Sequence, residues 1–137
     1  MTEKYLAAIV RHEKAKQAIR SVTREIGNAL SQCELDRAAL KDPYNKELWD
    51  EGFRHPKTHL WMAMQHREPS SCGWGEVPLC EDGMLDSLSE GSSYECPHCH
   101  EAYRLIAQRK KLREELWRAR LSIRALGRAA LKEACHD

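Results

Sequence analysis

The chain has 137 residues, of which 42% are apolar and 31% are charged, with a single Phe. This length fits one domain with a modest core, and the lack of an apolar run of about 18 residues argues against a membrane span. Six cysteines without a recognisable signal peptide indicate thiols that are reduced or bound to metal. We therefore expect a soluble cytoplasmic protein with no membrane partner.

The net charge of +1 conceals a strong segregation along the chain. Residues 1–41 carry 8 basic and 5 acidic side chains, residues 42–100 carry 4 and 11, and residues 101–137 carry 10 and 5. An acidic middle therefore separates two basic ends.

Residues 2–41 show the pattern of one long helix. Apolar side chains recur at alternate steps of three and four from Tyr5 to Cys33, and only His12 interrupts the series. Such spacing is typical of a heptad seam rather than of an ordinary amphipathic face. Several seam positions are alanine, so a partner helix can approach closely.

The acidic middle combines short helices with irregular chain. An Asp-Pro pair at 42–43 is a helix start, because Asp caps and Pro suits the first helical position. We expect short helices over 43–51 and 58–66. Residues 68–94 are rich in Pro, Ser and Gly and read as irregular, and so long a loop needs something to pin it.

The stretch Cys96-Pro97-His98-Cys99 has the spacing of a zinc knuckle. Two thiolates two residues apart can both bind one ion, but a tetrahedral site needs two further ligands. The nearest thiols are Cys72 and Cys80. We therefore expect Cys72, Cys80, Cys96 and Cys99 to bind one structural Zn²⁺, which would also pin the loop.

Other ligands remain open for this site. The side chains that could replace Cys72 or Cys80 are Cys33, His66, His98 and His100. In an antiparallel pairing of the two long helices, Cys33 would lie at the depth of Leu105. A redox pair is disfavoured, because no strand precedes the knuckle. Four cysteines would close the zinc site, and no catalytic motif is present, so we expect no enzyme activity.

Residues 101–135 repeat the seam of the first helix, from Ala102 to Ala130, with Arg109 as the exception. Two helices of about 50 Å with matching seams predict a mainly α fold, a long antiparallel coiled-coil-like hairpin with an irregular zinc-stabilised head. The expected organisation is a single domain of helix 2–41, head 42–100 and helix 101–135.

Large apolar side chains point to a protein partner. A thin hairpin has little room to bury four tryptophans, and Trp117 and Leu121 form an off-seam stripe with Tyr103 and Ile106. Either the short middle helices cover this stripe, or it forms a homodimer or partner surface.

Nucleic acid is the alternative partner. Basic side chains line residues 101–135 outside the seam, and Arg113, Arg120 and Arg124 could follow phosphates. We prefer the protein partner, because the acidic head would repel a nucleic acid near the zinc.

One stretch also carries a family resemblance. Cys-Pro-His-Cys-His followed by Glu-Ala-Tyr-Arg-Leu-Ile-Ala-Gln-Arg-Lys-Lys, residues 96–111, resembles small zinc-binding helical proteins of bacteriophages and prophages. The resemblance implies a phage accessory protein that acts on host or phage macromolecules, for example as an inhibitor of a defence protein.

Overall fold

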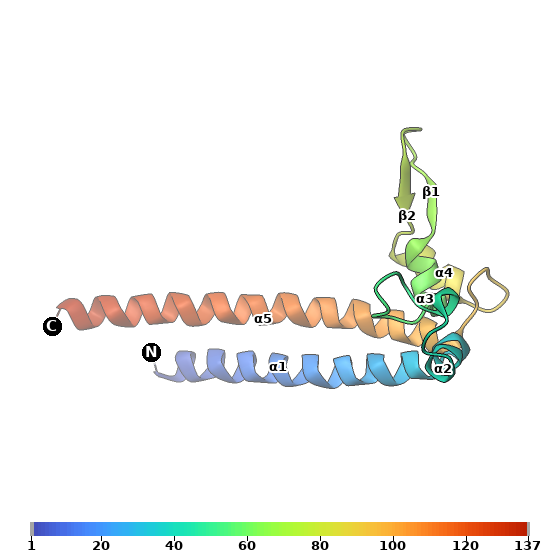
Figure 1. Cartoon of the computed structure of the whole chain (residues 1–137). Helices are drawn as coiled ribbons and strands as arrows, with labels where there is room; N and C mark the ends of the chain where they lie inside the picture. Colours follow the sequence, from blue (N-terminus) through green and yellow to red (C-terminus); the bar gives the residue numbers. More distant parts are fainter. Residues whose placement is uncertain (1, 137) are drawn as a thin grey trace. The chain divides into compact units, whose positions relative to one another are not determined.

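The computed structural model describes residues 2–136 and is mainly helical, with 71% of the chain in helices (Figure 1). This confirms the expected fold class. The elements in chain order are α1 (Thr2–Ser31), α2 (Glu34–Lys41), the 3-10 helix η1 (Lys46–Leu48), α3 (His59–Gln65), β1 (Arg67–Pro69), β2 (Glu76–Pro78), α4 (Glu81–Leu88) and α5 (Pro97–His136).

The chain forms two compact units. The paired-helix unit comprises residues 1–23 and 107–137, and the cysteine-rich unit comprises residues 24–106. The long helices α1 and α5 contribute to both units. The expectation of a single domain stays a prediction.

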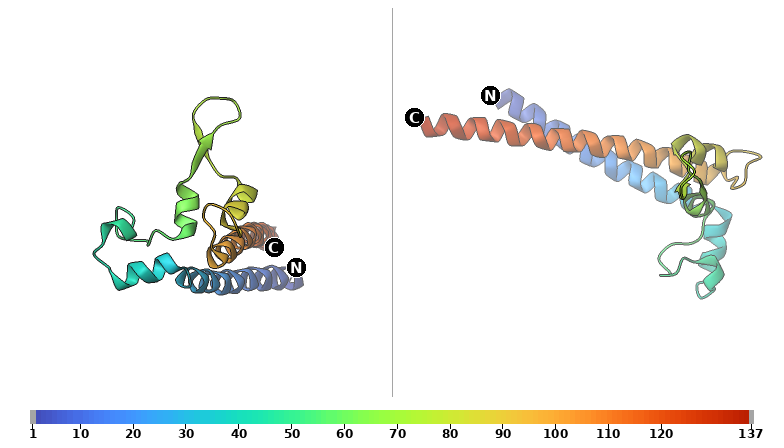
Figure 2. Two further views of the ribbon diagram at one scale, coloured as in Figure 1. Left: turned by 90° about the vertical axis from the view of Figure 1, so that its right-hand side faces the viewer. Right: turned by 90° about the horizontal axis from the view of Figure 1, so that it is seen from above.

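In the paired-helix unit, the first part of α1 runs alongside the last part of α5 (Figures 1 and 2). Arg109 donates to the Thr23 hydroxyl at 3.4 Å, and Arg120 donates to His12 Nε2 at 3.4 Å. From Thr23 to His12 the chain steps back eleven residues along α1, and from Arg109 to Arg120 it advances eleven residues along α5. Within this unit the helices are therefore antiparallel, as predicted.

Small side chains fill the interface of this unit. The buried residues are Ala8, Ala15, Val22 and Ala119. The three on α1 follow each other at intervals of seven, which is the heptad period read from the sequence. A seam of alanines lets two backbones approach closely but buries little apolar surface.

The cysteine-rich unit packs short elements around a small core. The eight buried residues of this core are Cys33, Leu60, Ala63, Met84, Leu88, Cys96, Cys99 and Ala102. Tyr103 and Ile106 pack against it and are half-buried. Part of the predicted off-seam stripe is therefore covered here, whereas Trp117 and Leu121, in the other unit, are exposed.

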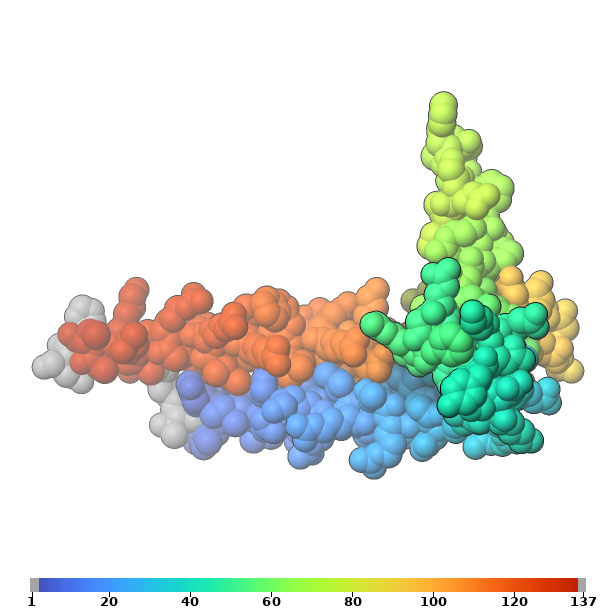
Figure 3. All heavy atoms as spheres, in the orientation of Figure 1, coloured from blue at the N-terminus to red at the C-terminus, as the bar shows by residue number. Residues whose placement is uncertain are grey.

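Residues 68–94 are more regular than expected. Strands β1 and β2 pair antiparallel with Glu68 opposite Val77, and this hairpin protrudes from the rest of the unit (Figure 3). Its turn contains Gly73 and Gly75 at φ 82° and 71°, a left-handed conformation that glycine adopts without steric cost. Helix α4 then follows. A strand pair, a turn with two left-handed glycines and a helix therefore give this segment regular structure.

Two predicted helices differ from those observed. The helix expected over 2–41 is interrupted at Cys33, whose φ of −64° and ψ of 133° are extended. The helix expected over 43–51 is reduced to η1, where Asn45 Oδ1 accepts from Glu47 N at 3.0 Å. The helix expected over 58–66 is present as α3, capped by the Thr58 hydroxyl, which accepts from Trp61 N at 3.1 Å.

Candidate metal centre

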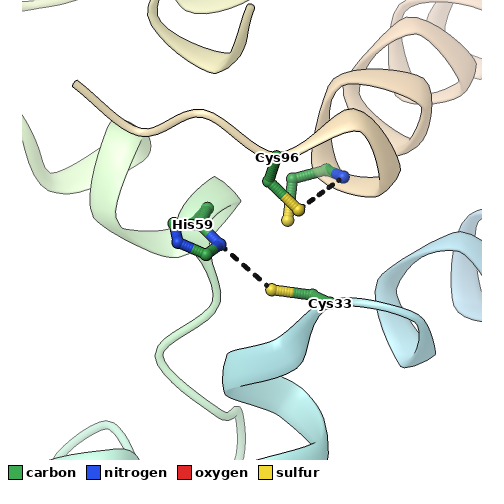
Figure 4. Close-up of side chains that lie close together, drawn as sticks. Cys33, His59 and Cys96 are labelled. Carbon is green, nitrogen blue, oxygen red and sulfur yellow. Dashed lines mark hydrogen bonds between the residues drawn. The ribbon is translucent and has the colours of Figure 1, made fainter. Parts of the chain in front are cut away.

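Four potential metal ligands converge within the cysteine-rich unit. They are Cys33, His59, Cys96 and Cys99, and their sulfur and nitrogen ligand atoms all lie within 4.8 Å of one another. Figure 4 shows Cys33 and His59 facing each other, with Cys96 beside them at the start of α5. Residues far apart in the sequence thus meet at one point.

Cys33 reaches the cluster because it stands at the corner between α1 and α2. Its backbone N–H donates to Leu30 O at 3.1 Å and closes the last turn of α1. Its carbonyl accepts from Arg37 N at 3.2 Å and opens α2. The extended residue between two helical turns therefore places its thiol at the bend.

The knuckle forms the start of α5. Pro97 occupies the first helical position, where its missing N–H costs nothing. Cys99 N donates to the Cys96 sulfur at 3.4 Å, and His100 N donates to Cys96 O at 2.9 Å. These hydrogen bonds hold both cysteines at the start of α5.

His59 supplies the fourth ligand from the first turn of α3. Its Nδ1 lies 3.3 Å from the Cys33 sulfur. The preceding Thr58 caps the helix and the following Leu60 is buried in the core. The cap and the core contact together fix the direction of the imidazole.

Burial makes this cluster suited to a closed site. Cys33 and Cys99 are 0% exposed and Cys96 is 5% exposed. The ligand atoms of a tetrahedral zinc ion with bonds of about 2.3 Å lie about 3.8 Å apart, a spacing compatible with atoms that all fall within 4.8 Å. Three thiolates and one imidazole are a donor set typical of structural zinc.

The two fully buried thiols, Cys33 and Cys99, lie close enough to shift each other's pKa. A hydrogen bond with the Cys99 side chain holds the pKa of Cys33 well below its ordinary value, although burial acts in the opposite direction. The same hydrogen bond, followed by burial, raises the pKa of Cys99. Because cysteine binds metal as thiolate, zinc binding would displace the protons that these thiols carry.

The structure brings Cys96 and Cys99 of the predicted ligand set into this cluster and places Cys72 and Cys80 elsewhere. Cys72 is exposed between β1 and β2, with its sulfur 3.2 Å from the Ser70 hydroxyl. Cys80 is exposed at the start of α4, where its sulfur accepts from Gly83 N at 3.4 Å. Both sulfurs interact with neighbours in the sequence, so neither reaches across the unit.

Among the alternative ligands considered, Cys33 belongs to the cluster and the three histidines do not. His66 Nδ1 lies 2.9 Å from the Tyr94 hydroxyl, His98 is exposed and His100 is half-buried. Cys33 lies beside Cys99 rather than at the depth of Leu105, so the helices pair here in a different register from the one expected.

His59 was not considered from the sequence. The signal was its place directly after Thr58, because the first residue of a capped helix has a defined direction. Sequence spacing could not show that this helix start faces Cys33, which is 26 residues away.

Comparisons of the chain with protein-family models, curated proteins and solved structures find no match. None of the helices within residues 2–136 combines the length and apolar character needed to cross a membrane. The resemblance to phage proteins stays a prediction.

Proposed function

We propose that this chain is a non-enzymatic, zinc-stabilised helical protein that binds a protein partner. The observation that carries the zinc proposal is the meeting of Cys33, His59, Cys96 and Cys99 from three elements at one buried point. The resemblance of residues 96–111 supports a further proposal, that the partner is a host or defence protein modulated by a phage or prophage accessory protein.

The donor set favours a structural rather than a catalytic ion. Catalytic zinc keeps one position open for water or substrate, whereas four protein ligands fill a tetrahedral ion. The core of the cysteine-rich unit contains eight buried residues, three of which are the cysteine ligands. Because so small an apolar core contributes little folding free energy, the unit would rely on a bound metal for stability. Structural zinc contributes about 10 kcal/mol of folding free energy in small sites.

Zinc content in matched variants tests this assignment. We expect one zinc per chain in the wild type and in the Cys72→Ser, Cys80→Ser double variant. Cys33→Ser and His59→Asn should each lower zinc affinity at least tenfold, measured by competition with a chromogenic chelator. Loss of zinc from the double variant with retention in Cys33→Ser would overturn the assignment.

A cleft in the cysteine-rich unit supports the protein-partner proposal. It has a volume of about 810 Å³ and three aromatic side chains among its walls; it is lined by Lys46, Trp49, Asp50, Glu51, Gly52, Phe53, Lys57, Trp61 and Gln65. Lys57 Nζ lies 5.3 Å from the Trp61 ring centroid. Aromatic side chains with charged neighbours are the composition of interface hot spots.

The loop beside this aromatic cleft is held in a costly conformation. Asp50 Oδ1 accepts from the backbone N–H of Arg54 at 2.9 Å and of His55 at 3.3 Å. Phe53 is 42% exposed at φ 52°, a left-handed conformation that costs a non-glycine residue about 1 kcal/mol. The indole N–H of Trp49 is buried and has no hydrogen-bond partner among residues 2–136, a further cost. Such costs are typical of binding surfaces.

Differential capture tests the partner proposal. Immobilised wild type, Phe53→Ala and Tyr44→Ala would be exposed to lysate and bound proteins quantified by mass spectrometry. Tyr44 is 90% exposed and lies outside the aromatic cleft, so it is the control. We expect a protein that binds the wild type and Tyr44→Ala but is depleted about tenfold with Phe53→Ala. Equal capture by all three would contradict the proposal.

A further inference from the structure

Helix α5 carries a regular row of cations in the paired-helix unit. The row, called the cationic stripe below, consists of Lys110, Arg113, Trp117, Arg120, Arg124 and Arg128. Successive members are separated by three or four residues, so they share one side of the helix. All six are exposed. From first to last the stripe spans about 27 Å at 1.5 Å per residue.

The cations of this stripe are not neutralised by acidic neighbours. Within residues 2–136, none of its five Lys and Arg side chains lies within ion-pair distance of a carboxylate. Arg104, earlier on the same helix, shows the contrast, because it donates two hydrogen bonds to Glu101 at 2.7 and 2.9 Å. The stripe therefore keeps its charge available to a partner.

The composition of the whole unit reinforces this charge. Residues 1–23 and 107–137 contain fourteen Lys and Arg against six Asp and Glu, a net charge of +8. Like charges at helical spacing repel each other, so the unit folds against its own electrostatics. A polyanion bound along the stripe would remove this repulsion.

An exposed aromatic ring lies in the middle of the stripe. Trp117 is 52% exposed, and the guanidinium carbon of Arg124 lies 5.9 Å from its ring centroid. A hollow of about 440 Å³ beside the ring is lined by Lys110, Arg113, Glu114, Trp117 and Arg118. Proteins that bind single strands combine a basic track for phosphates with aromatic rings on which bases stack.

We propose that the cationic stripe binds single-stranded nucleic acid, with Lys and Arg contacting phosphates and Trp117 stacking on a base. This is a function beyond the protein partner and does not depend on zinc. A duplex would satisfy the cations but offers Trp117 no unstacked base. A protein partner is disfavoured on this surface, because charged side chains are depleted from interface cores and here surround the tryptophan.

Two triple variants distinguish the contribution of the cationic stripe to binding from that of net charge alone. The stripe variant carries Arg113→Glu, Arg124→Glu and Arg128→Glu; Arg120 is kept because it donates to His12. The control variant carries Lys14→Glu, Arg20→Glu and Lys111→Glu, all exposed cations of the same unit outside the stripe. Both change net charge equally. Circular dichroism and zinc content verify that each variant is folded.

Fluorescence anisotropy with a labelled 15-nucleotide polythymidylate, between 50 and 200 mM salt, measures binding. We expect affinity to fall with salt at a log–log slope near −0.7 per phosphate contacted. The stripe variant should lose at least about thirtyfold in affinity and the control less than about fivefold. Equal losses of affinity in the two variants would show that binding depends only on net charge, and this would overturn the proposal. Absence of binding by the wild type would also overturn it.

Trp117 provides an independent readout of stacking. Trp117→Ala should weaken binding to the single strand about tenfold without changing the salt slope, and Trp117→Phe should restore most of the loss. A duplex of the same length should bind more weakly than the single strand. Unchanged affinity in Trp117→Ala, or tighter binding of the duplex, would overturn the single-strand assignment.

Discussion

The two units of this chain reach stability by opposite means. The paired-helix unit is regular, buries mostly alanine, and carries a net charge of +8. The cysteine-rich unit, residues 24–106, is built from short elements around three thiols and an imidazole, and its eight basic and fifteen acidic residues give a net charge of −7. The paired-helix unit depends on the heptad spacing of its buried residues. The cysteine-rich unit depends on the cluster of Cys33, His59, Cys96 and Cys99.

This difference predicts distinct weak points. Small seam side chains contribute little apolar burial, so the paired-helix unit should be sensitive to any charge placed in its seam. The cysteine-rich unit has few large core side chains, so it should depend on its metal.

Removal of zinc should unfold the cysteine-rich unit selectively. Structural zinc contributes about 10 kcal/mol in small sites, far more than a single side chain. Hydrogen exchange after chelation, or in Cys99→Ser, should show lost amide protection over residues 24–106 and substantial protection left in the paired-helix unit. Cys80→Ser is the matched control. Uniform loss of protection in both units would contradict the contrast.

A charge in the seam should destabilise the paired-helix unit. Val22 is buried in its interface, so Val22→Asp places an unpaired carboxylate there, at a cost of about 3–4 kcal/mol. Ser21→Asp, at the exposed neighbouring position, should cost less than about 0.5 kcal/mol. Thermal unfolding followed by circular dichroism measures both. A similar melting temperature for the two variants would show that the seam is not a close interface.

The sequence predicted the paired-helix unit more completely than the cysteine-rich unit. The heptad spacing of Ala8, Ala15 and Val22 is local information, and it was enough to predict long helices and their antiparallel pairing. Cys96 and Cys99 were identified because both ligands lie in one turn. Cys33 and His59 come from separate elements, and only packing brings them together. Proximity in sequence favoured Cys72 and Cys80, but their sulfurs interact with residues two or three positions away.

Glycine at position 53 should stabilise the cysteine-rich unit. Phe53 adopts φ 52° and is 42% exposed, so we expect the relief of about 1 kcal/mol of left-handed strain in Phe53→Gly to outweigh the contacts that the ring gives up. Tyr44→Gly, where φ is not positive, should instead be neutral or destabilising by up to about 1 kcal/mol. Chemical denaturation compares the two. A lower stability of Phe53→Gly would mean that the ring contributes more packing than its exposure implies.

Salt should affect the two units differently. Repulsion between unpaired cations at helical spacing costs about 0.2–0.5 kcal/mol per pair and is screened by salt. Protection of paired-helix amides should therefore rise between 20 and 300 mM sodium chloride. The stripe variant described above should lose this dependence. A fall in protection with salt would indicate that ion pairs, rather than repulsion, dominate the surface of this unit.

We infer that Cys33, His59, Cys96 and Cys99 together hold one structural zinc ion. X-ray absorption at the zinc edge of the purified protein measures the ligand set directly. We expect three sulfur ligands at about 2.3 Å and one nitrogen at about 2.0 Å, with no water bound to the ion. Four sulfur ligands, or a coordinated water, would contradict it.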